Sequence, residues 1–168
     1  MRSEMSKKYE LTNETKTLAD GTVLHRIRAL RDIPRFGVKA GDLGGLIEKE
    51  NNLSQDGNAW VSGDACVSGD AEVSGNAKVS GDAKVSGNAE VSANADYMVI
   101  KNTWSSGRWF TYTRSNKMWK VGCFYGSGDE LIKKAYADSE LSGKCYEAIV
   151  RAVETIEAAK AKAKGEMK

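Results

Sequence analysis

The feature that most constrains this chain is a six-residue repeat that runs from Val61 to Asp96. The hexads read VSGDAC, VSGDAE, VSGNAK, VSGDAK, VSGNAE and VSANAD without a slip. A period of six cannot hold one face of an α-helix, which turns once every 3.6 residues. The Gly-Asp or Gly-Asn pair in most hexads would also break a flat strand. The repeat therefore predicts a chain that turns at every hexad and winds into a coil.

Three hexads make one turn of such a coil, so valines 18 residues apart would stack on one another. The small alanine four positions after each valine lets the walls approach the axis, and Gly with Asn or Asp tolerates positive φ at the corners. Ile47 and Leu53 extend the pattern backward, with a two-residue insertion before Val61. The predicted stacks are Val61 on Val79, Val67 on Val85, and Val73 on Val91.

An aliphatic residue followed by a small residue four positions later resembles the hexapeptide repeat of left-handed β-helices. The left hand is implied by this resemblance, not by the spacing. We therefore expect a mainly β fold with a short left-handed parallel β-helix of about three coils over residues 46–96. Because repeat arrays need covered ends, residues 1–45 are predicted as an N-terminal β-hairpin cap. Residues 97–168 are predicted as a C-terminal α+β module, a β-hairpin with two helices.

Turn residues mark the two expected hairpins. Asp20-Gly21 lies between two segments of alternating polarity and predicts the N-terminal hairpin. Ser115-Asn116 lies between the expected strands Trp109–Arg114 and Met118–Tyr125 and predicts the second one. Each flank of the coil should therefore begin or end in antiparallel strands.

The end of the chain is predicted to be helical. Ser127 followed by Glu130 is the sequence of a capping box, and it should begin a helix that ends near Asp138. A second, longer helix should extend from Ser142 to about Lys164. Its apolar residues have helical spacing and are predicted to form a buried stripe: Cys145, Ile149, Val153 and Ile156.

The charge pattern excludes some partners. The net charge is only +2, so no overall field favours nucleic acid or a membrane surface, and direct DNA binding is not expected. Residues 41–96 carry three basic and ten acidic residues, a balance of −7, between ends of +4 and +5. No run of about 18 apolar residues predicts a membrane span, and residues 1–10 lack the apolar core of a signal peptide.

The three cysteines, Cys66, Cys123 and Cys145, form no CxxC pair. This usage is typical of a reducing cytosol and argues against a disulfide framework or a zinc site. We therefore expect a protein of a reducing cytoplasm, with no metal and no cofactor.

Catalysis is the obvious alternative, because many hexapeptide-repeat proteins are acyltransferases. Those enzymes resemble one another in a general-base histidine near the coil, whereas the one histidine here, His25, lies in the expected N-terminal cap. A γ-type carbonic anhydrase would need several histidines from the coil, and the repeats contain none. We predict no catalytic residue and no enzyme activity, with an acyltransferase as the weaker alternative.

The stretch from residue 104 to residue 125 mixes aromatic and basic residues. Rings that stack on bases beside cations that hold phosphate would suit a nucleotide, and the same residue types dominate protein interfaces. The plainer alternative is that half of the aromatics form the core of a small module. The candidate binding residues are Trp104, Arg108, Trp109, Tyr112, Arg114, Asn116, Lys117 and Trp119.

Self-association is a further expectation. Hexapeptide β-helices commonly form trimers side by side, so the resemblance implies a homotrimer. Trp60 is a large apolar residue at an outward position of the repeat, and with Val61 it is the predicted oligomer interface. The alternative is that Trp60 packs under the insertion of its own chain.

Two further segments are distinctive: residues 43–48 (LGGLIE) lie ahead of the repeats, and residues 104–114 (WSSGRWFTYTR) lead into 121–124 (VGCF). They resemble a family of phage and prophage proteins that join hexapeptide repeats to a C-terminal α/β module. The resemblance covers nearly the whole chain. It implies a phage or prophage source and the cytoplasm of the bacterial host, and it implies no reaction.

From this resemblance we expect a non-enzymatic phage-type binding or scaffold protein. It would antagonise a bacterial defence system, as an anti-CRISPR inhibitor does, by binding a host protein complex or by sequestering a nucleotide second messenger. A structural or assembly accessory protein is the alternative.

Overall fold

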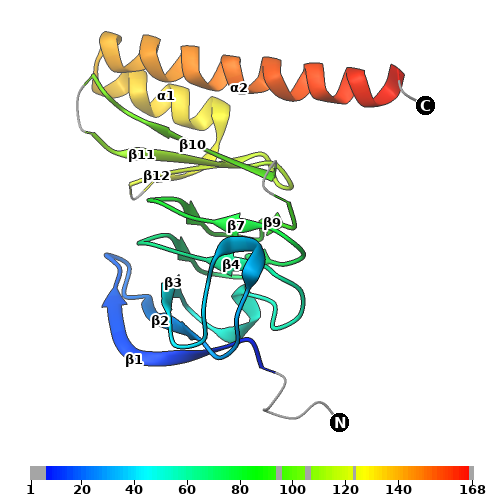
Figure 1. Cartoon of the computed structure of the whole chain (residues 1–168). Helices are drawn as coiled ribbons and strands as arrows, with labels where there is room; N and C mark the ends of the chain where they lie inside the picture. The colour runs from blue at the N-terminus through cyan, green and yellow to red at the C-terminus, as the bar shows by residue number, and fades with distance from the viewer. Residues whose placement is uncertain (1–6, 94–95, 105–106, 123, 167–168) are drawn as a thin grey trace. The chain divides into compact units, whose positions relative to one another are not determined.

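The structure, a computed structural model, describes residues 7–93, 96–104, 107–122 and 124–166. It is mainly β with a C-terminal helical part (Figure 1). The chain divides into two compact units, residues 1–123 and 124–168. The boundary between them lies within the range 97–168 that the sequence suggested as one module, and each unit is described by itself below.

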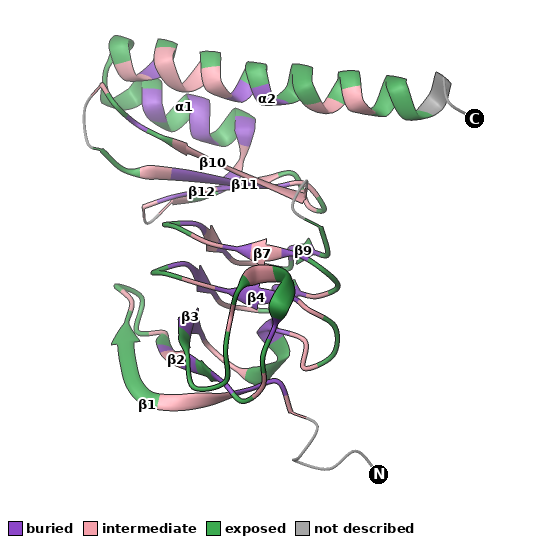
Figure 2. Ribbon diagram, in the orientation of Figure 1, coloured by how far each residue is buried: buried purple, intermediate pink, exposed green. Residues whose placement is uncertain are grey.

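Six two-residue strands form the centre of the first unit, and they pair in parallel at a spacing of 18 residues. Val61 pairs with Val79, Val67 with Val85, and Val73 with Val91, which confirms the predicted stacking. All of these valines are fully buried (Figure 2), and the corner glycines from 63 to 87 have φ between 62° and 68°. The strands are β4 (Trp60–Val61), β5 (Cys66–Val67), β6 (Glu72–Val73), β7 (Lys78–Val79), β8 (Lys84–Val85) and β9 (Glu90–Val91).

A first layer of the coil precedes these repeats. In it, Ile47 of β3 (Leu43–Ile47) pairs with Val67, and Leu53 bridges to Val73. In each pair the two residues are 20 positions apart instead of 18, because the two-residue insertion lies between the first and second layers. Asn52, at the end of the 3-10 helix η3 (Glu50–Asn52), is fully buried at this point. Its amide group donates to the carbonyls of Gly69 and Ala71 and accepts from two amides of its own turn, so the insertion leaves this buried polar group satisfied.

An antiparallel hairpin continues one wall of the coil. Strands β1 (Tyr9–Thr17) and β2 (Val23–Ala29) pair around Gly21, as predicted from Asp20-Gly21. Strand β2 then pairs with β3, which gives the five-stranded sheet β1-β2-β3-β5-β8. The short 3-10 helix η2 (Pro34–Phe36) follows in the loop before β3.

Side chains from this N-terminal segment satisfy carbonyls at the open start of the coil. The Tyr9 hydroxyl donates to the Leu53 carbonyl at 2.6 Å, and the Lys8 ammonium donates to the Ala59 carbonyl at 2.6 Å. Arg31 donates to the Gly57 carbonyl at 3.0 Å. Both Lys8 and Tyr9 are fully buried. Since an unpaired buried carbonyl is costly, these donors replace the strand that would otherwise continue the stack.

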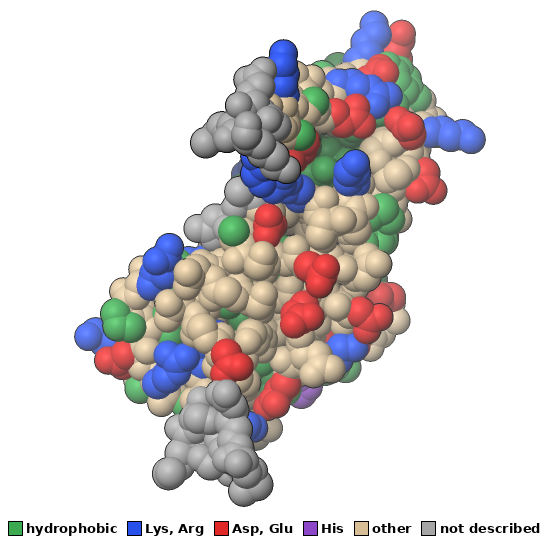
Figure 3. Space-filling view, turned by 90° about the vertical axis from the view of Figure 1, so that its right-hand side faces the viewer, with side chains coloured by type: hydrophobic (Ala, Val, Ile, Leu, Met, Phe, Trp, Pro, Cys, Tyr) green, Lys and Arg blue, Asp and Glu red, His purple; other side chains and the backbone are tan. Residues whose placement is uncertain are grey.

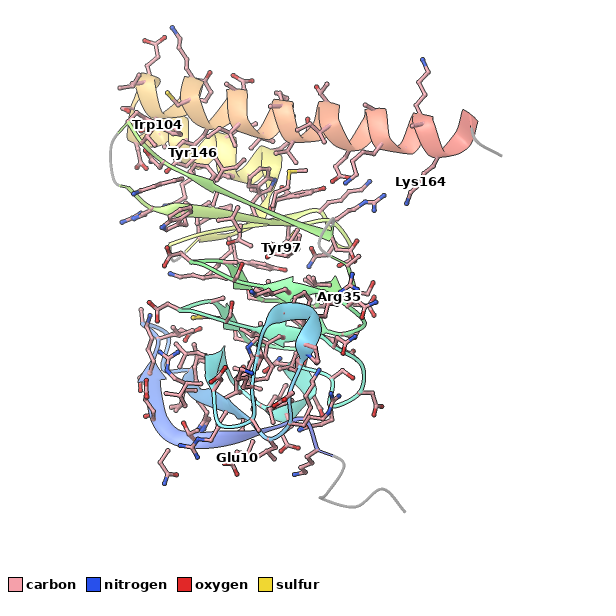
Figure 4. The ribbon with its side chains drawn as sticks, viewed as in Figure 1. Glu10, Arg35, Tyr97, Trp104, Tyr146 and Lys164 are labelled. Atoms are coloured by element: carbon pink, nitrogen blue, oxygen red, sulfur yellow. The ribbon has the colours of Figure 1, made fainter. Side chains whose placement is uncertain are left out.

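The other end of the coil is covered by an antiparallel sheet of β10 (Tyr97–Lys101), β11 (Trp109–Thr113) and β12 (Met118–Val121). Hydroxyl groups of this sheet form hydrogen bonds with backbone groups that the last layer leaves unpaired. The Lys84 amide donates to Thr111 Oγ1 at 2.9 Å, and the Tyr97 hydroxyl donates to the Lys78 carbonyl at 2.7 Å (Figure 4). The Asp96 carboxylate accepts from the Ser92 amide at 2.9 Å, so the coil ends close to Asp96 as predicted.

The second unit contains β13 (Phe124–Ser127), α1 (Gly128–Asp138) and α2 (Glu140–Glu166). The capping box is confirmed, because Ser127 and Glu130 each accept from the other's backbone amide. The prediction of one strand over Met118–Tyr125 is wrong. Strand β12 ends at Val121, and Gly122 adopts a φ of 55°, in the left-handed region that an extended strand does not use.

The predicted buried stripe of the second helix is wrong in part. Val153 is buried, but the other buried valine is Val150, and Ile156 is 45% exposed. The face that packs is therefore rotated from the predicted one. Among the described residues, no helix is long and apolar enough to cross a membrane.

Replacing Gly45 by alanine should destabilise the first layer. A Cβ at this position would lie 2.5 Å from Val61 Cγ1 and 2.7 Å from the Ala65 carbonyl oxygen, so the walls would have to separate. We expect a loss of about 1–3 kcal/mol in the free energy of unfolding, measured by urea denaturation. Gly45→Ser should lose at least as much, because the larger side chain adds a further atom to the same crowded space. A Gly45→Ala protein as stable as the wild type would contradict this explanation.

The buried Lys8 should make stability depend on pH. Burial lowers the pKa of its ammonium from 10.5 to about 8, with Arg31 adding to the shift and Asp56 opposing it. Between pH 8 and 10.5 the unfolded chain therefore holds a proton that the folded chain has lost, so this group adds stability as pH rises. We expect the stability difference between wild type and Lys8→Met to grow in favour of wild type over that window, by denaturation at each pH. A difference that is flat with pH would contradict it.

Candidate functional site

The predicted aromatic and basic residues do not form one surface. Tyr112 and Trp119 are only 6% and 2% exposed, and their ring centroids lie 5.0 Å apart. Trp119 also meets Phe110 edge-on at 6.2 Å, and Trp104 lies 6.1 Å from the same Phe110 ring. Tyr112 and Trp119 therefore belong to a core, which was the alternative interpretation of the aromatic residues.

The two arginines lie at opposite ends of β11. Arg108 precedes the strand and is exposed, whereas Arg114 follows it and lies 3.9 Å from the Asp96 carboxylate. Six residues of extended chain separate them by about 20 Å. A single nucleotide phosphate could not be held by both.

The remaining candidates divide between these two ends. Near Arg108, the Lys101 ammonium lies 5.6 Å from the centroid of the half-buried Trp109 ring, a cation–π contact. At the other end Asn116 shapes the turn, since its Oδ1 accepts from Thr113 Oγ1 at 2.6 Å. Lys117 is exposed and has a positive φ of 56°. Of the predicted set, Arg108 and Lys117 are exposed and Trp109 is half-buried.

The predicted oligomer interface is wrong. Trp60 is 1% exposed and Val61 is fully buried within the chain itself. Trp60 lies in the same core cluster as Ile33, and the partly buried Phe36 packs against that cluster. A residue that its own chain covers cannot present itself to a second copy, so Trp60 gives no support for side-by-side packing of coils.

The coil has three walls, and segments of the chain cover two of them. On the wall of β3, β5 and β8, the outward Leu46 and Cys66 pack with Leu24 in a separate buried cluster. On the wall of β4 and β7, the loop that contains Phe36 lies over the strands, with the Lys78 ammonium 5.5 Å from the Phe36 ring. In the part of the chain that the structure describes, the outward side chains of the third wall, β6 with β9, are exposed.

The outward side chains of this third wall are Glu72 and Glu90, which stand opposite each other on neighbouring strands. We call this surface the glutamate face. Both residues are exposed, and among the described residues neither carboxylate has an ion-pair or hydrogen-bond partner. Like charges directly opposite each other in a sheet are destabilising. The glutamate face therefore places two like charges on neighbouring strands, an arrangement that we expect to be unfavourable.

A groove of about 450 Å³ adjoins the glutamate face at the start of the coil. It is lined by Glu72, Asp70, Gln55 and Leu53, among others, and Lys49 lies across it, 3.2 Å from the Asp70 carboxylate. Figure 3 shows one side of the molecule, on which several acidic side chains lie over the surface of the coil. The groove and the glutamate face together offer carboxylates to a cationic group.

Other reactive side chains have structural surroundings. His25 lies in β2, with Nδ1 3.3 Å from the Thr12 carbonyl oxygen. Burial raises the pKa of the Cys66 thiol, which makes it a poor nucleophile, and Cys123 lies outside the described residues. Within the described ranges no group of three His, Cys, Asp or Glu residues is placed to hold a metal ion.

A scan against models of protein families finds none that matches this chain, and a search of curated proteins finds no matching relative.

The glutamate face was not predicted from the sequence, although the 18-residue spacing of the repeat was sufficient to predict it. The residue before each repeat valine points outward, and residues 18 apart stack. Applying that spacing to this position pairs Cys66 with Lys84, and Glu72 with Glu90. The second pair is the like-charged ladder.

Removing one of the two charges should stabilise the fold. We expect Glu72→Gln and Glu90→Gln each to raise the melting temperature at low salt, because either change removes the repulsion. The double variant should gain no more than one single variant, since the repulsion is gone after the first change. Thermal unfolding of the four proteins measures this, and 1 M salt should reduce the gains. Additive gains that persist in salt would show that the two carboxylates do not interact.

Proposed function

We propose that this chain is a non-enzymatic phage-type antagonist of bacterial defence that binds a host protein complex through the glutamate face. The coil, a short left-handed parallel β-helix in this proposal, serves as a rigid support. The observation that carries the proposal is the pair of exposed carboxylates, Glu72 and Glu90, on the wall that no described segment covers. A fold keeps a destabilising feature of this kind when a partner uses it.

The chemistry of the glutamate face selects a basic partner. Proteins that handle nucleic acid carry Lys- and Arg-rich surfaces, and defence complexes that act on invading nucleic acid need such surfaces. A lysine or arginine placed between the two carboxylates would exchange the repulsion for attraction, and opposite charges across an interface raise the association rate. Direct binding of DNA is disfavoured by the same argument, because phosphate and carboxylate share their sign.

A protein target fits the geometry better than a nucleotide signal. The arginines that would hold a phosphate lie about 20 Å apart along the strand, and two of the predicted stacking rings, Tyr112 and Trp119, are buried. In this proposal the protein acts in the cytoplasm of the host and binds no cofactor. A structural or assembly accessory role is the alternative, and infection of defended and undefended hosts separates the two.

Reversing the charge of the glutamate face should abolish antagonism. We expect the wild-type chain to restore phage plating on a defended host and Glu72→Lys to lose that effect, since the partner's cations would then meet a like charge. Plaque counts with and without the defence system measure it. Asp138→Lys is the control, because it makes the same charge change at an exposed residue of α1 and should still restore plating.

Two outcomes would contradict the proposal. Equal plating with and without the gene would remove the antagonist function altogether. Full antagonism by Glu72→Lys, in protein shown to be folded by circular dichroism, would leave the function possible but exclude the glutamate face.

A further inference from the structure

Helix α2 carries an apolar seam outside its buried side. With 27 residues against 11, α2 is about 40 Å long and α1 about 16 Å. The buried side of α2 includes Val150 and Val153. The seam lies on another side of the helix, where three alanines are exposed, Ile156 is 45% exposed, and Cys145 and Ile149 are half-buried. Its six residues are Cys145, Ile149, Ala152, Ile156, Ala159 and Ala163.

The spacing of this seam is 4-3-4-3-4, which is the alternation of a and d positions in a coiled coil. It extends over 19 residues, from Cys145 to Ala163, about 27 Å along the helix. A single surface helix with one buried stripe needs no second stripe of this regularity, since solvent-facing positions are ordinarily polar. The seam therefore has the form of a surface that receives another helix.

We propose that α2 pairs with α2 of a second copy, antiparallel, about a two-fold axis at the level of Glu154. In that register Ile149 of one copy opposes Ala159 of the other, and Ala152 opposes Ile156. Cys145 opposes Ala163 at both ends. Each layer then combines one larger side chain with an alanine, so the helices keep one separation along the whole seam. This is the self-complementary arrangement that a two-fold interface requires.

A parallel pair would fit less well. It would place isoleucine on isoleucine in some layers and alanine on alanine in the next, so the layers would alternate between crowded and empty. Charge favours the same choice. Residues 140–154 carry three acidic and two basic residues, a balance of −1, and residues 155–166 carry two acidic and three basic residues, a balance of +1. The antiparallel pair sets opposite halves side by side and separates the lysines that flank the seam, Lys160 and Lys162.

Self-association through α2 does not depend on the target of the glutamate face, and it differs from side-by-side packing of coils. It predicts a mass of twice 18.2 kDa, with the monomer recovered on dilution.

Light scattering after size exclusion tests the seam. We expect the wild type to reach the dimer mass as concentration rises, and Ala159→Glu to remain a monomer because it places a charge in the seam. Ala161→Glu introduces the same charge at an exposed position of the same helix, outside the seam, and should still dimerise. Circular dichroism should give equal helix content for both variants. A wild type that stays monomeric, a trimer mass, or equal loss in both variants would overturn the proposal.

Cysteine cross-linking tests the direction. Ala163→Cys should form a covalent dimer on mild oxidation, since the new thiol would oppose Cys145 of the second copy. The wild type should not form one, and neither should Ala161→Cys. Adding Cys145→Ser to Ala163→Cys should abolish the cross-link. A cross-link that persists in this double variant, or one formed by the wild type through Cys145, would show a parallel pair and overturn the antiparallel register.

Discussion

The fold depends on how the two open ends of a short parallel stack are satisfied. Each layer bonds to the next through backbone groups, so a stack of three layers leaves one row of groups open at each end. At the start of the coil, Lys8 and Tyr9 supply donors to carbonyls. At the other end, Thr111 supplies a hydroxyl acceptor to an amide. On one wall strand β2 pairs with β3, and side chains supply partners to other open groups at both ends, so the stack can stop after three layers.

Burying the N-terminal donors costs free energy, because these polar groups lose their hydration. An ammonium in the interior loses its hydration, and the lowered pKa of Lys8 measures that loss. Two carbonyl oxygens, of Ala59 and Asp56, partly replace the lost water. Burial likewise raises the pKa of Tyr9, helped by the Glu50 carboxylate, so this hydroxyl stays a donor at any ordinary pH. The cap is therefore a set of strong donors held where the coil presents acceptors.

The repeat made the coil predictable, and the flanks were harder for a physical reason. Stacking follows from a period, so Val61 on Val79 could be read from spacing alone. Exposure of an outward residue depends on which distant segment folds over it. Trp60 looked free in the repeat, but it is buried in the core cluster against which Phe36 packs. In the same way Trp119 looked available beside its basic neighbours, although cross-strand packing with Tyr112 buries it. Neither contact can be predicted from the order of residues along the chain.

The walls of the coil differ in how far the rest of the chain covers them, and this difference affects how two copies can associate. The N-terminal segment covers two walls of the coil with apolar contacts, which removes them from any packing between copies. The third wall carries the like-charged Glu72 and Glu90, and two such walls facing each other would double the repulsion. Association between copies is therefore better supplied by the apolar seam of α2 than by the coil. A pair formed that way would present two glutamate faces, and a target with two basic sites would be held more tightly by the pair than by either copy alone.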